Sequence, residues 1–147
     1  MRFSYQPYDV IPTPATPDAT KIYRPVIPVR FSSRTASAII WSLLDTGADE
    51  SYITEEMAEF LGVEPIAEAT YGVESAGGEL TARYGVCDVE VRYGGEIFAR
   101  RVIIGIVPET WSEAILGHAS FLEFFDATFS HADKAVELRE RTPPGSG

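Results

Sequence analysis

Apolar and polar residues alternate along much of the chain, and this alternation predicts strands. Within residues 86–92, Cys87, Val89 and Val91 share one face, while mainly charged residues share the other. A period of two residues is typical of a strand that is buried on one face. A glycine pair then turns the chain into a second apolar run at residues 97–106, so the two segments are expected to form a hairpin.

Further apolar runs predict strands on both sides of this hairpin. Pro25 and Pro28 favour an edge position for the first of them, because proline has no N–H to donate to a neighbouring strand. A turn at Ala76, Gly77 and Gly78 separates two of the strands and predicts another hairpin. The predicted strands cover residues 22–32, 38–44, 68–75, 79–84 and 135–139.

Two segments have helical features. Residues 54–62 space their apolar side chains three and four positions apart, as on one face of a helix. Thr54 is a suitable N-cap and Gly62 a suitable stop after the last turn. A second short helix is expected near residues 118–125. Because strands dominate, the sequence predicts an all-β fold, closed and barrel-like, with one or two short helices.

Composition divides the chain into three parts. Residues 1–21 are rich in proline and threonine and predict an extended arm. Residues 22–140 hold the predicted strands and helices, and their number suits one domain with one core. Residues 141–147 have the composition of a flexible tail.

Charge narrows the classes of partner. The formal net charge is −10, and no basic stripe is present to neutralise phosphates, so nucleic acid is not an expected partner. The anionic face of a membrane would repel the same charge, and the apolar runs are too short to span a bilayer. Solubility alone also explains the acidity.

Cysteine and histidine usage bears on compartment and cofactors. The single cysteine, Cys87, excludes an intrachain disulfide and fits a reducing compartment. Residues 1–10 contain no apolar segment of the kind found in secretory signals. We therefore expect a cytoplasmic protein. With two histidines and one cysteine, neither a metal site nor another cofactor is expected.

The candidate chemistry is concentrated at Asp45, Thr46 and Gly47, directly after the apolar run. A carboxylate at the end of a buried strand is costly unless it is hydrogen-bonded or functional. Gly47 permits a tight turn, and the Thr46 hydroxyl can hold that turn to a neighbouring group. Ala48 is small and leaves space above the carboxylate. The tripeptide alone fits an ordinary turn equally well, since it arises by chance in on the order of a few per cent of chains of this size.

Over residues 22–138 the chain resembles the retropepsin-like aspartic proteases in three blocks. The first is residues 43–48, Leu-Leu-Asp-Thr-Gly-Ala, followed by a predicted helix that ends in Leu-Gly. The second is a glycine-tipped hairpin at residues 73–79, where the family places its flap. The third is residues 114–117, Ala-Ile-Leu-Gly, a segment that the family packs beneath the catalytic turn. The order and spacing of the blocks carry the resemblance.

The resemblance implies the acid-protease fold and an aspartic endopeptidase that hydrolyses peptide bonds with an activated water. This chemistry needs two carboxylates that share one proton, and the chain has one Asp-Thr-Gly, so a homodimer with one carboxylate from each chain is expected. The implied catalytic residues are Asp45, Thr46 and Gly47. The implied substrate-binding residues are Ala48, Asp49, Glu50, Ser75, Ala76, Gly77, Gly78 and Ile115.

Several points stay open at this level. The family usually carries an arginine where this chain has His118, which is expected either to make a weaker contact with Asp49 or simply to flank a helix. Asp126 is followed by no glycine, so it is not expected to be a second catalytic acid. The arm could add strands to the dimer, cover the cleft or be removed by processing. A module that binds peptides or dimerises without catalysis is the alternative function, although the intact Asp-Thr-Gly favours the enzyme.

Overall fold

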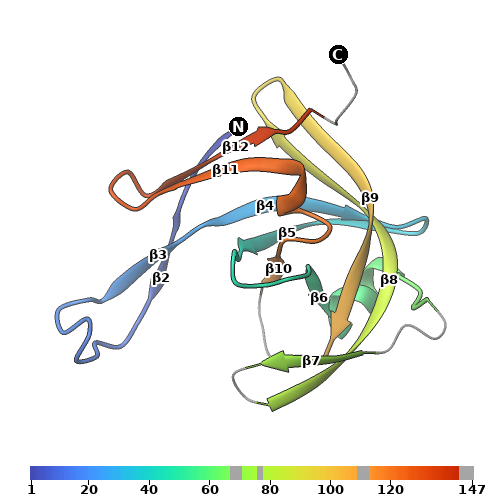
Figure 1. The fold of residues 1–147 in the computed structure, drawn as a ribbon, viewed down its shortest axis with the longest axis horizontal. Coiled ribbons are helices and arrows are strands. Elements are labelled where there is room, and N and C mark those ends of the chain that lie inside the picture. Colours follow the sequence, from blue (N-terminus) through green and yellow to red (C-terminus); the bar gives the residue numbers. More distant parts are fainter. Residues whose placement is uncertain (67–70, 76–77, 109–112, 143–147) are drawn as a thin grey trace.

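The computed structural model describes residues 1–66, 71–75, 78–108 and 113–142, and for 71–75 and 78–82 it describes the backbone. Strands dominate, as Figure 1 shows, and confirm the predicted all-β fold. The elements are β1 (Arg2–Ser4), β2 (Gln6–Asp9), β3 (Lys21–Arg24), β4 (Val26–Ser32), β5 (Ser37–Leu44), β6 (Tyr52–Thr54), α1 (Glu55–Leu61), β7 (Tyr71–Ser75), β8 (Gly78–Tyr93), β9 (Glu96–Val107), β10 (Ala114–Leu116), the 3-10 helix η1 (Leu122–Phe124), β11 (Phe125–Ser130) and β12 (Ala135–Glu140).

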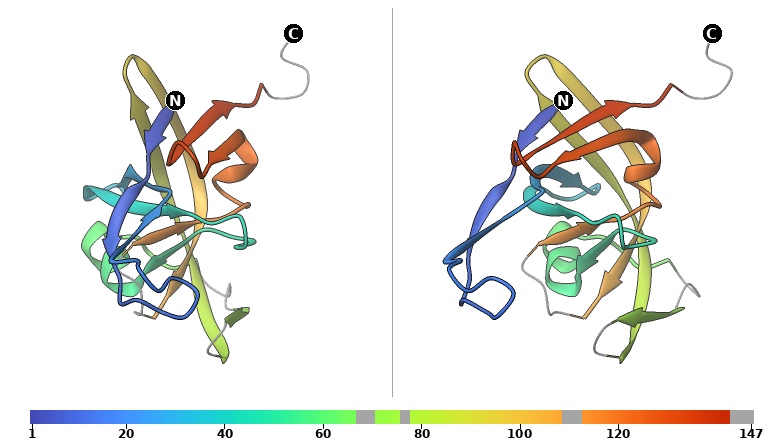
Figure 2. Two further views of the ribbon diagram at one scale, coloured as in Figure 1. Left: turned by 90° about the vertical axis from the view of Figure 1, so that its left-hand side faces the viewer. Right: turned by 60° about the vertical axis from the view of Figure 1, so that its left-hand side comes forward.

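Within the described residues, six strands close into a barrel. Their order is β4-β5-β10-β6-β9-β8, and β8 returns to β4 at the pairs from Arg30↔Glu90 to Ser32↔Asp88. The β8–β9 hairpin is long, and Figure 2 shows it running along one side of the molecule. Strand β7 pairs with the end of β8 that extends beyond the barrel. The closed, barrel-like architecture expected from the sequence is therefore confirmed.

The inward-facing residues of the strands form the core. Alternation in β8 places Cys87, Val89 and Val91 inside, as the sequence predicted. Aromatic rings from the η1 region extend the core, and Phe98 and Phe125 lie with their centroids 4.6 Å apart. The largest fully buried side chains are Phe31, Phe98, Phe121, Ile27, Ile53, Leu61, Ile104, Ile106, Leu116, Leu138, Val26 and Val29.

Proline in β4 occupies an edge, as expected. Pro28 stands opposite Trp41 of β5 on one side, whereas β8 pairs with β4 only from Arg30 onward. Within the described part of the chain, the first half of β4 therefore has one neighbouring strand, and the missing N–H of Pro28 leaves no gap in a ladder.

One predicted helix is confirmed and the other is shorter than expected. In α1 the hydroxyl of Thr54 accepts a hydrogen bond from the Met57 N–H at 3.2 Å, and Gly62 ends the helix in the left-handed region at φ 69°. The second short helix, expected near residues 118–125, is the 3-10 helix η1, and it begins only after Ser120, which has φ 73°. A positive φ interrupts the helical hydrogen-bond ladder at that point.

The N-terminal residues are extended and contain strands. Strand β1 pairs with β12, which also pairs with β11, so the two ends of the chain share a three-stranded sheet. Strands β2 and β3 form a separate two-stranded ribbon that projects to one side in Figure 1. The division of the chain at residue 22 and the role of the arm stay predictions.

Candidate active site

The candidate catalytic turn begins where β5 ends. Strand β10 lies parallel to β5, with Ile115 opposite Leu43 and Leu116 opposite Leu44. The ladder continues one step further, because the Asp45 N–H donates to the Leu116 carbonyl at 3.0 Å. Asp45 therefore leaves the sheet with its backbone held on one side, and its side chain projects from the end of a rigid strand.

Local hydrogen bonds then orient the carboxylate. The Gly47 N–H donates to Oδ1 of Asp45 at 2.9 Å, and the Ala48 N–H donates to the Asp45 carbonyl at 3.2 Å. A Cβ on residue 47 would lie 3.2 Å from Oδ1, so glycine gives the carboxylate its room. Thr46 and Gly47 are exposed, and Asp45 is half-buried. One carboxylate oxygen is thus fixed while the turn stays open to solvent.

The segment after β10 supports the turn from beneath, as the resemblance implied. Gly117 lies so close that a Cβ there would overlap the carbonyl oxygens of Glu50 and Ala48. The buried Ser51 hydroxyl accepts from the Gly117 N–H at 3.0 Å and donates to the Ala119 carbonyl at 2.8 Å. Further bonds run from the backbone N–H groups of residues 118 and 119 to the carbonyls of residues 48 and 49. The turn is therefore clamped by segments that lie far apart in the sequence.

His118 contacts the turn itself. Its Nε2 lies 2.7 Å from the Thr46 carbonyl oxygen, and because a carbonyl only accepts, Nε2 carries the proton and donates it. Of the two possibilities left open for His118, the contact with Asp49 is not observed, since no ion pair joins these two residues in the described chain. The imidazole instead contacts the backbone of the candidate catalytic turn.

An apolar cluster lies beside the turn. Tyr52, Tyr84, Val107 and Ile115 are buried together, and Leu43 and Ala48 pack against them. The implied substrate-binding residues Ala48 and Ile115 therefore lie together beside Asp45, whereas the side chain of Asp49 is exposed.

Glu50 is engaged within the chain. Its Oε2 accepts from the hydroxyls of Tyr52 at 3.0 Å and Tyr84 at 2.6 Å. Burial, together with the neighbouring Glu50 carboxylate, raises the pKa of Tyr52. Sequence reasoning missed this cluster: Tyr52 is close to Glu50 in the chain, but no sequence signal connects Tyr84 to it.

The predicted glycine-centred hairpin is present as paired strands. Strands β7 and β8 are in register from Tyr71↔Ala82 to Ser75↔Gly78, which places the backbones of two implied substrate-binding residues opposite each other. These two residues are Ser75 and Gly78. Ala76 and Gly77, the other implied substrate-binding residues of this hairpin, lie outside the described residues.

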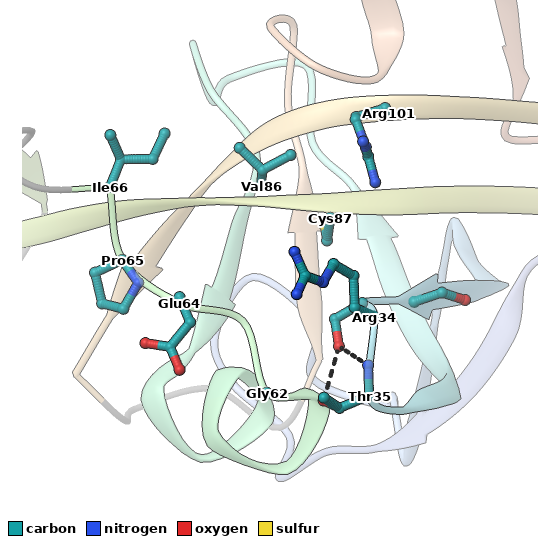
Figure 3. A pocket seen from close by; sticks show the side chains of 11 residues that line it. Arg34, Thr35, Gly62, Glu64, Pro65, Ile66, Val86, Cys87 and Arg101 are labelled. Atoms are coloured by element: carbon teal, nitrogen blue, oxygen red, sulfur yellow. Dashed lines mark hydrogen bonds between the residues drawn. The ribbon is translucent and has the colours of Figure 1, made fainter.

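A separate hollow lies at the other end of β5. A cavity of about 510 Å³ is lined by the β4–β5 turn, the end of α1 and part of β8, and Figure 3 shows Arg34, Val86 and Cys87 among its lining residues. The eight residues of β5 separate the β4–β5 turn that lines this cavity from Asp45. Burial raises the pKa of the Cys87 thiol to about 12, so that sulfur is not a reactive nucleophile.

The described residues also bear on metal binding and on membrane insertion. Among the described residues, no group of three or more histidine, cysteine, aspartate or glutamate side chains is arranged to hold a metal ion. No helix in the described part of the chain has the length and apolar character needed to cross a membrane.

Comparison with known proteins agrees with the resemblance seen in the sequence. A family model described as aspartyl protease matches residues 27–119. A search of curated proteins gave no match. A retropepsin-like aspartic protease from Rickettsia conorii is 23% identical with a TM-score of 0.51, and the alignment covers 76% of this chain and 88% of that one. This similarity shows the fold.

Two further solved structures are similar at lower scores. The EIAV protease in complex with an inhibitor is 22% identical with a TM-score of 0.48, over 65% of this chain and 82% of that one. The retroviral protease-like domain of Ddi1 from Leishmania major is 15% identical with a TM-score of 0.46, over 78% of this chain and 88% of that one.

Proposed function

Because the chain belongs to the aspartyl protease family, we propose that it is an endopeptidase whose water is activated by Asp45 from each of two chains. The arrangement of the Asp45 carboxylate carries this proposal. Oδ1 is held by the Gly47 N–H at 2.9 Å, and Oδ2 has no partner in the described chain. One oxygen is therefore fixed, and the other is free to face a second carboxylate and a water.

The chemistry assigns different tasks to the two carboxylates. They share one proton, because two like charges at contact distance do not both ionise. The ionised carboxylate accepts a proton from the attacking water, while the protonated one donates a hydrogen bond to the scissile carbonyl oxygen. Activity is expected to be highest at acidic to mildly acidic pH, where the pair keeps one proton.

A second copy of the chain is the proposed source of the second carboxylate. Asp126, the alternative within the chain, lies at the start of β11, and its Oδ2 accepts from Arg139 at 2.9 Å. It is engaged in a different sheet and lacks the turn that holds Asp45. In the proposed homodimer the exposed Thr46 and Gly47 face the two-fold axis, and the Thr46 hydroxyls hold the two turns together.

The proposed substrate is an extended peptide segment. It would lie between the catalytic turn and the β7–β8 hairpin and form backbone hydrogen bonds to neighbouring strands. Ala48 and Ile115 would contact its side chains, Asp49 its backbone, and residues 75–78 would cover it. Closure of that hairpin would exclude bulk water during the reaction. The proposed setting is the cytoplasm, which the single cysteine favours.

Two acid-to-amide variants test catalysis. Asp45→Asn removes the proposed base, and Asp126→Asn is the matched control, because it alters an exposed ion pair on another sheet. With a diverse peptide pool at about pH 4 to 7, wild type and control should cleave, and Asp45→Asn should lose at least about 100-fold in rate. Identical products from wild type and Asp45→Asn would refute the protease and favour the non-catalytic peptide-binding module.

Mass in solution tests the dimer separately. Analytical ultracentrifugation across a concentration series should show a dimer, and specific activity should fall as the chain is diluted into monomer. A strict monomer with full activity would exclude the shared pair of Asp45 residues, although it would leave the family assignment intact.

A further inference from the structure

One carboxylate joins the catalytic loop to the base of the β7–β8 hairpin. Oε2 of Glu50 accepts two hydrogen bonds, one from Tyr52 of β6 and one from Tyr84 of β8. Both tyrosines are buried and pack with Val107 and Ile115. Hydrogen bonds to an ionised acceptor are about twice as strong as neutral ones. Glu50 therefore holds two strands to the loop that follows Asp45.

Tyr84 lies where β8 leaves the barrel. Residues 78–82 of β8 pair with β7, and the first pairs with β9 are Arg83↔Ile106 and Tyr84↔Gly105. A third segment meets the same residue, because the Ile66 N–H donates to the Tyr84 carbonyl at 2.6 Å. Figure 1 shows the β7 and β8 strands of this hairpin extending beyond the barrel. The direction of the hairpin is therefore set at Tyr84, the residue whose hydroxyl donates a hydrogen bond to Glu50.

The packing around the Tyr52 ring also permits this contact. A Cβ on Gly105 would overlap the Tyr52 ring, so the glycine leaves the space in which that ring lies. The same residue is opposite Tyr84 in the β8–β9 ladder. Both tyrosines thus meet at one glycine, and their hydroxyls converge on one oxygen of Glu50.

We propose that Glu50 is a positioning residue, which holds the base of the β7–β8 hairpin in a fixed orientation relative to Asp45, rather than a residue that binds the substrate backbone. The inference rests on the proposed function, because it assigns the hairpin a role in covering a peptide. A hairpin that opens and closes needs a firm base, so that closure brings it to the same place over the substrate each time.

A pair of tyrosine-to-phenylalanine variants tests this role. Tyr84→Phe keeps the ring and removes only the hydroxyl, whereas Tyr93→Phe, at the exposed far end of the same strand, is the matched control. Glu50→Gln is the second variant, because its amide oxygen still accepts hydrogen bonds but carries no charge. Both readouts, amide hydrogen exchange of residues 71–83 and the kinetic constants, are measured on the full chain.

Tyr84→Phe is expected to make exchange in the hairpin strands about fivefold faster. The KM for a cleaved peptide should rise about fivefold while kcat stays within about twofold, because Asp45 and its turn are unchanged. Glu50→Gln should give a smaller shift of the same kind, and the double variant less than the sum of the two. Tyr93→Phe should leave both readouts at wild-type values.

Two failures are distinguishable. Unchanged exchange and KM in Tyr84→Phe, or equal changes in Tyr93→Phe, would overturn the positioning role. A wild-type chain that cleaves no peptide would overturn the proposed function instead. Hydrogen exchange would then still decide whether Glu50 holds the hairpin, since it requires no substrate.

Discussion

Replacement of Ser51 by alanine should destabilise the chain far more than the loss of one small hydroxyl suggests. The Ser51 side chain is 2% exposed, and its Oγ joins the Gly117 N–H and the Ala119 carbonyl to the loop that follows Asp45. Alanine fills nearly the same space but can neither accept nor donate. Both backbone groups would lose this partner in the segment that supports the candidate catalytic turn.

The expected magnitude follows from those two groups. A buried polar group without a partner costs about 1–3 kcal/mol, so two partly relaxed groups predict a loss of about 2–3 kcal/mol. Ser42→Ala is the matched control, because Ser42 is equally buried but donates only to the Ile40 carbonyl two residues away in its own strand. Removal of that single local bond should cost about 1 kcal/mol or less.

Urea unfolding of the two variants and wild type, at one chain concentration, measures the difference. The corresponding fall in Tm is about 6–9 °C for Ser51→Ala, at about 3 °C per kcal/mol for a chain of this size. A Ser51→Ala variant no less stable than Ser42→Ala would refute the claim that this hydroxyl connects the turn to its support.

Two further changes probe the same packing and the core. Gly117→Ala should cost about 1–3 kcal/mol and abolish most activity, because the added methyl would displace the carbonyls of Ala48 and Glu50; a variant with wild-type urea midpoint and activity would contradict this. Burial raises the pKa of the Cys87 thiol from 9.0 to about 12, so the folded chain keeps a proton that the unfolded chain loses. The contribution of this thiol to the free energy of unfolding is fully present below pH 9.0, the pKa of the unfolded chain. It should therefore fall as the pH rises toward 12, by up to about 1.4 kcal/mol per pH unit. Urea midpoints between about pH 9 and 10 should show a shallower slope in Cys87→Ala, and equal slopes would exclude the thiol as the cause.

Local features of the fold were readable from neighbouring residues. Thr54 and Gly62 mark the ends of α1 because capping depends on a hydroxyl and a left-handed residue at fixed offsets from the helix. Alternation around Cys87 predicted which face of β8 is buried, because a strand turns its side chains to opposite faces. Proline at residue 28 marked the edge of β4 for an equally local reason.

Within the candidate site, Asp45 and the small residues around it could be predicted from the sequence. The signal is the order along the chain of an apolar strand, an acid, a turn and a later glycine segment. The sequence left open whether His118 contacts Asp49 or flanks a helix, because the side chain's reach depends on the path of the backbone, which brings the imidazole to the Thr46 carbonyl. The second helix is present but begins later than residue 118, since Ser120 adopts a positive φ after the candidate catalytic turn.

What the sequence determined by itself was therefore the long strands β4, β5, β8 and β9, the first helix and the acid at the end of β5, all of which depend on residues close together in the chain. The tertiary structure alone decided which distant groups share a bond: Ser51 with Gly117, and Glu50 with Tyr84. Such pairs are separated by tens of residues, and their geometry exists only after the barrel has closed. Hydrogen bonds require distances near 3 Å, which no pattern along a chain specifies for residues so far apart.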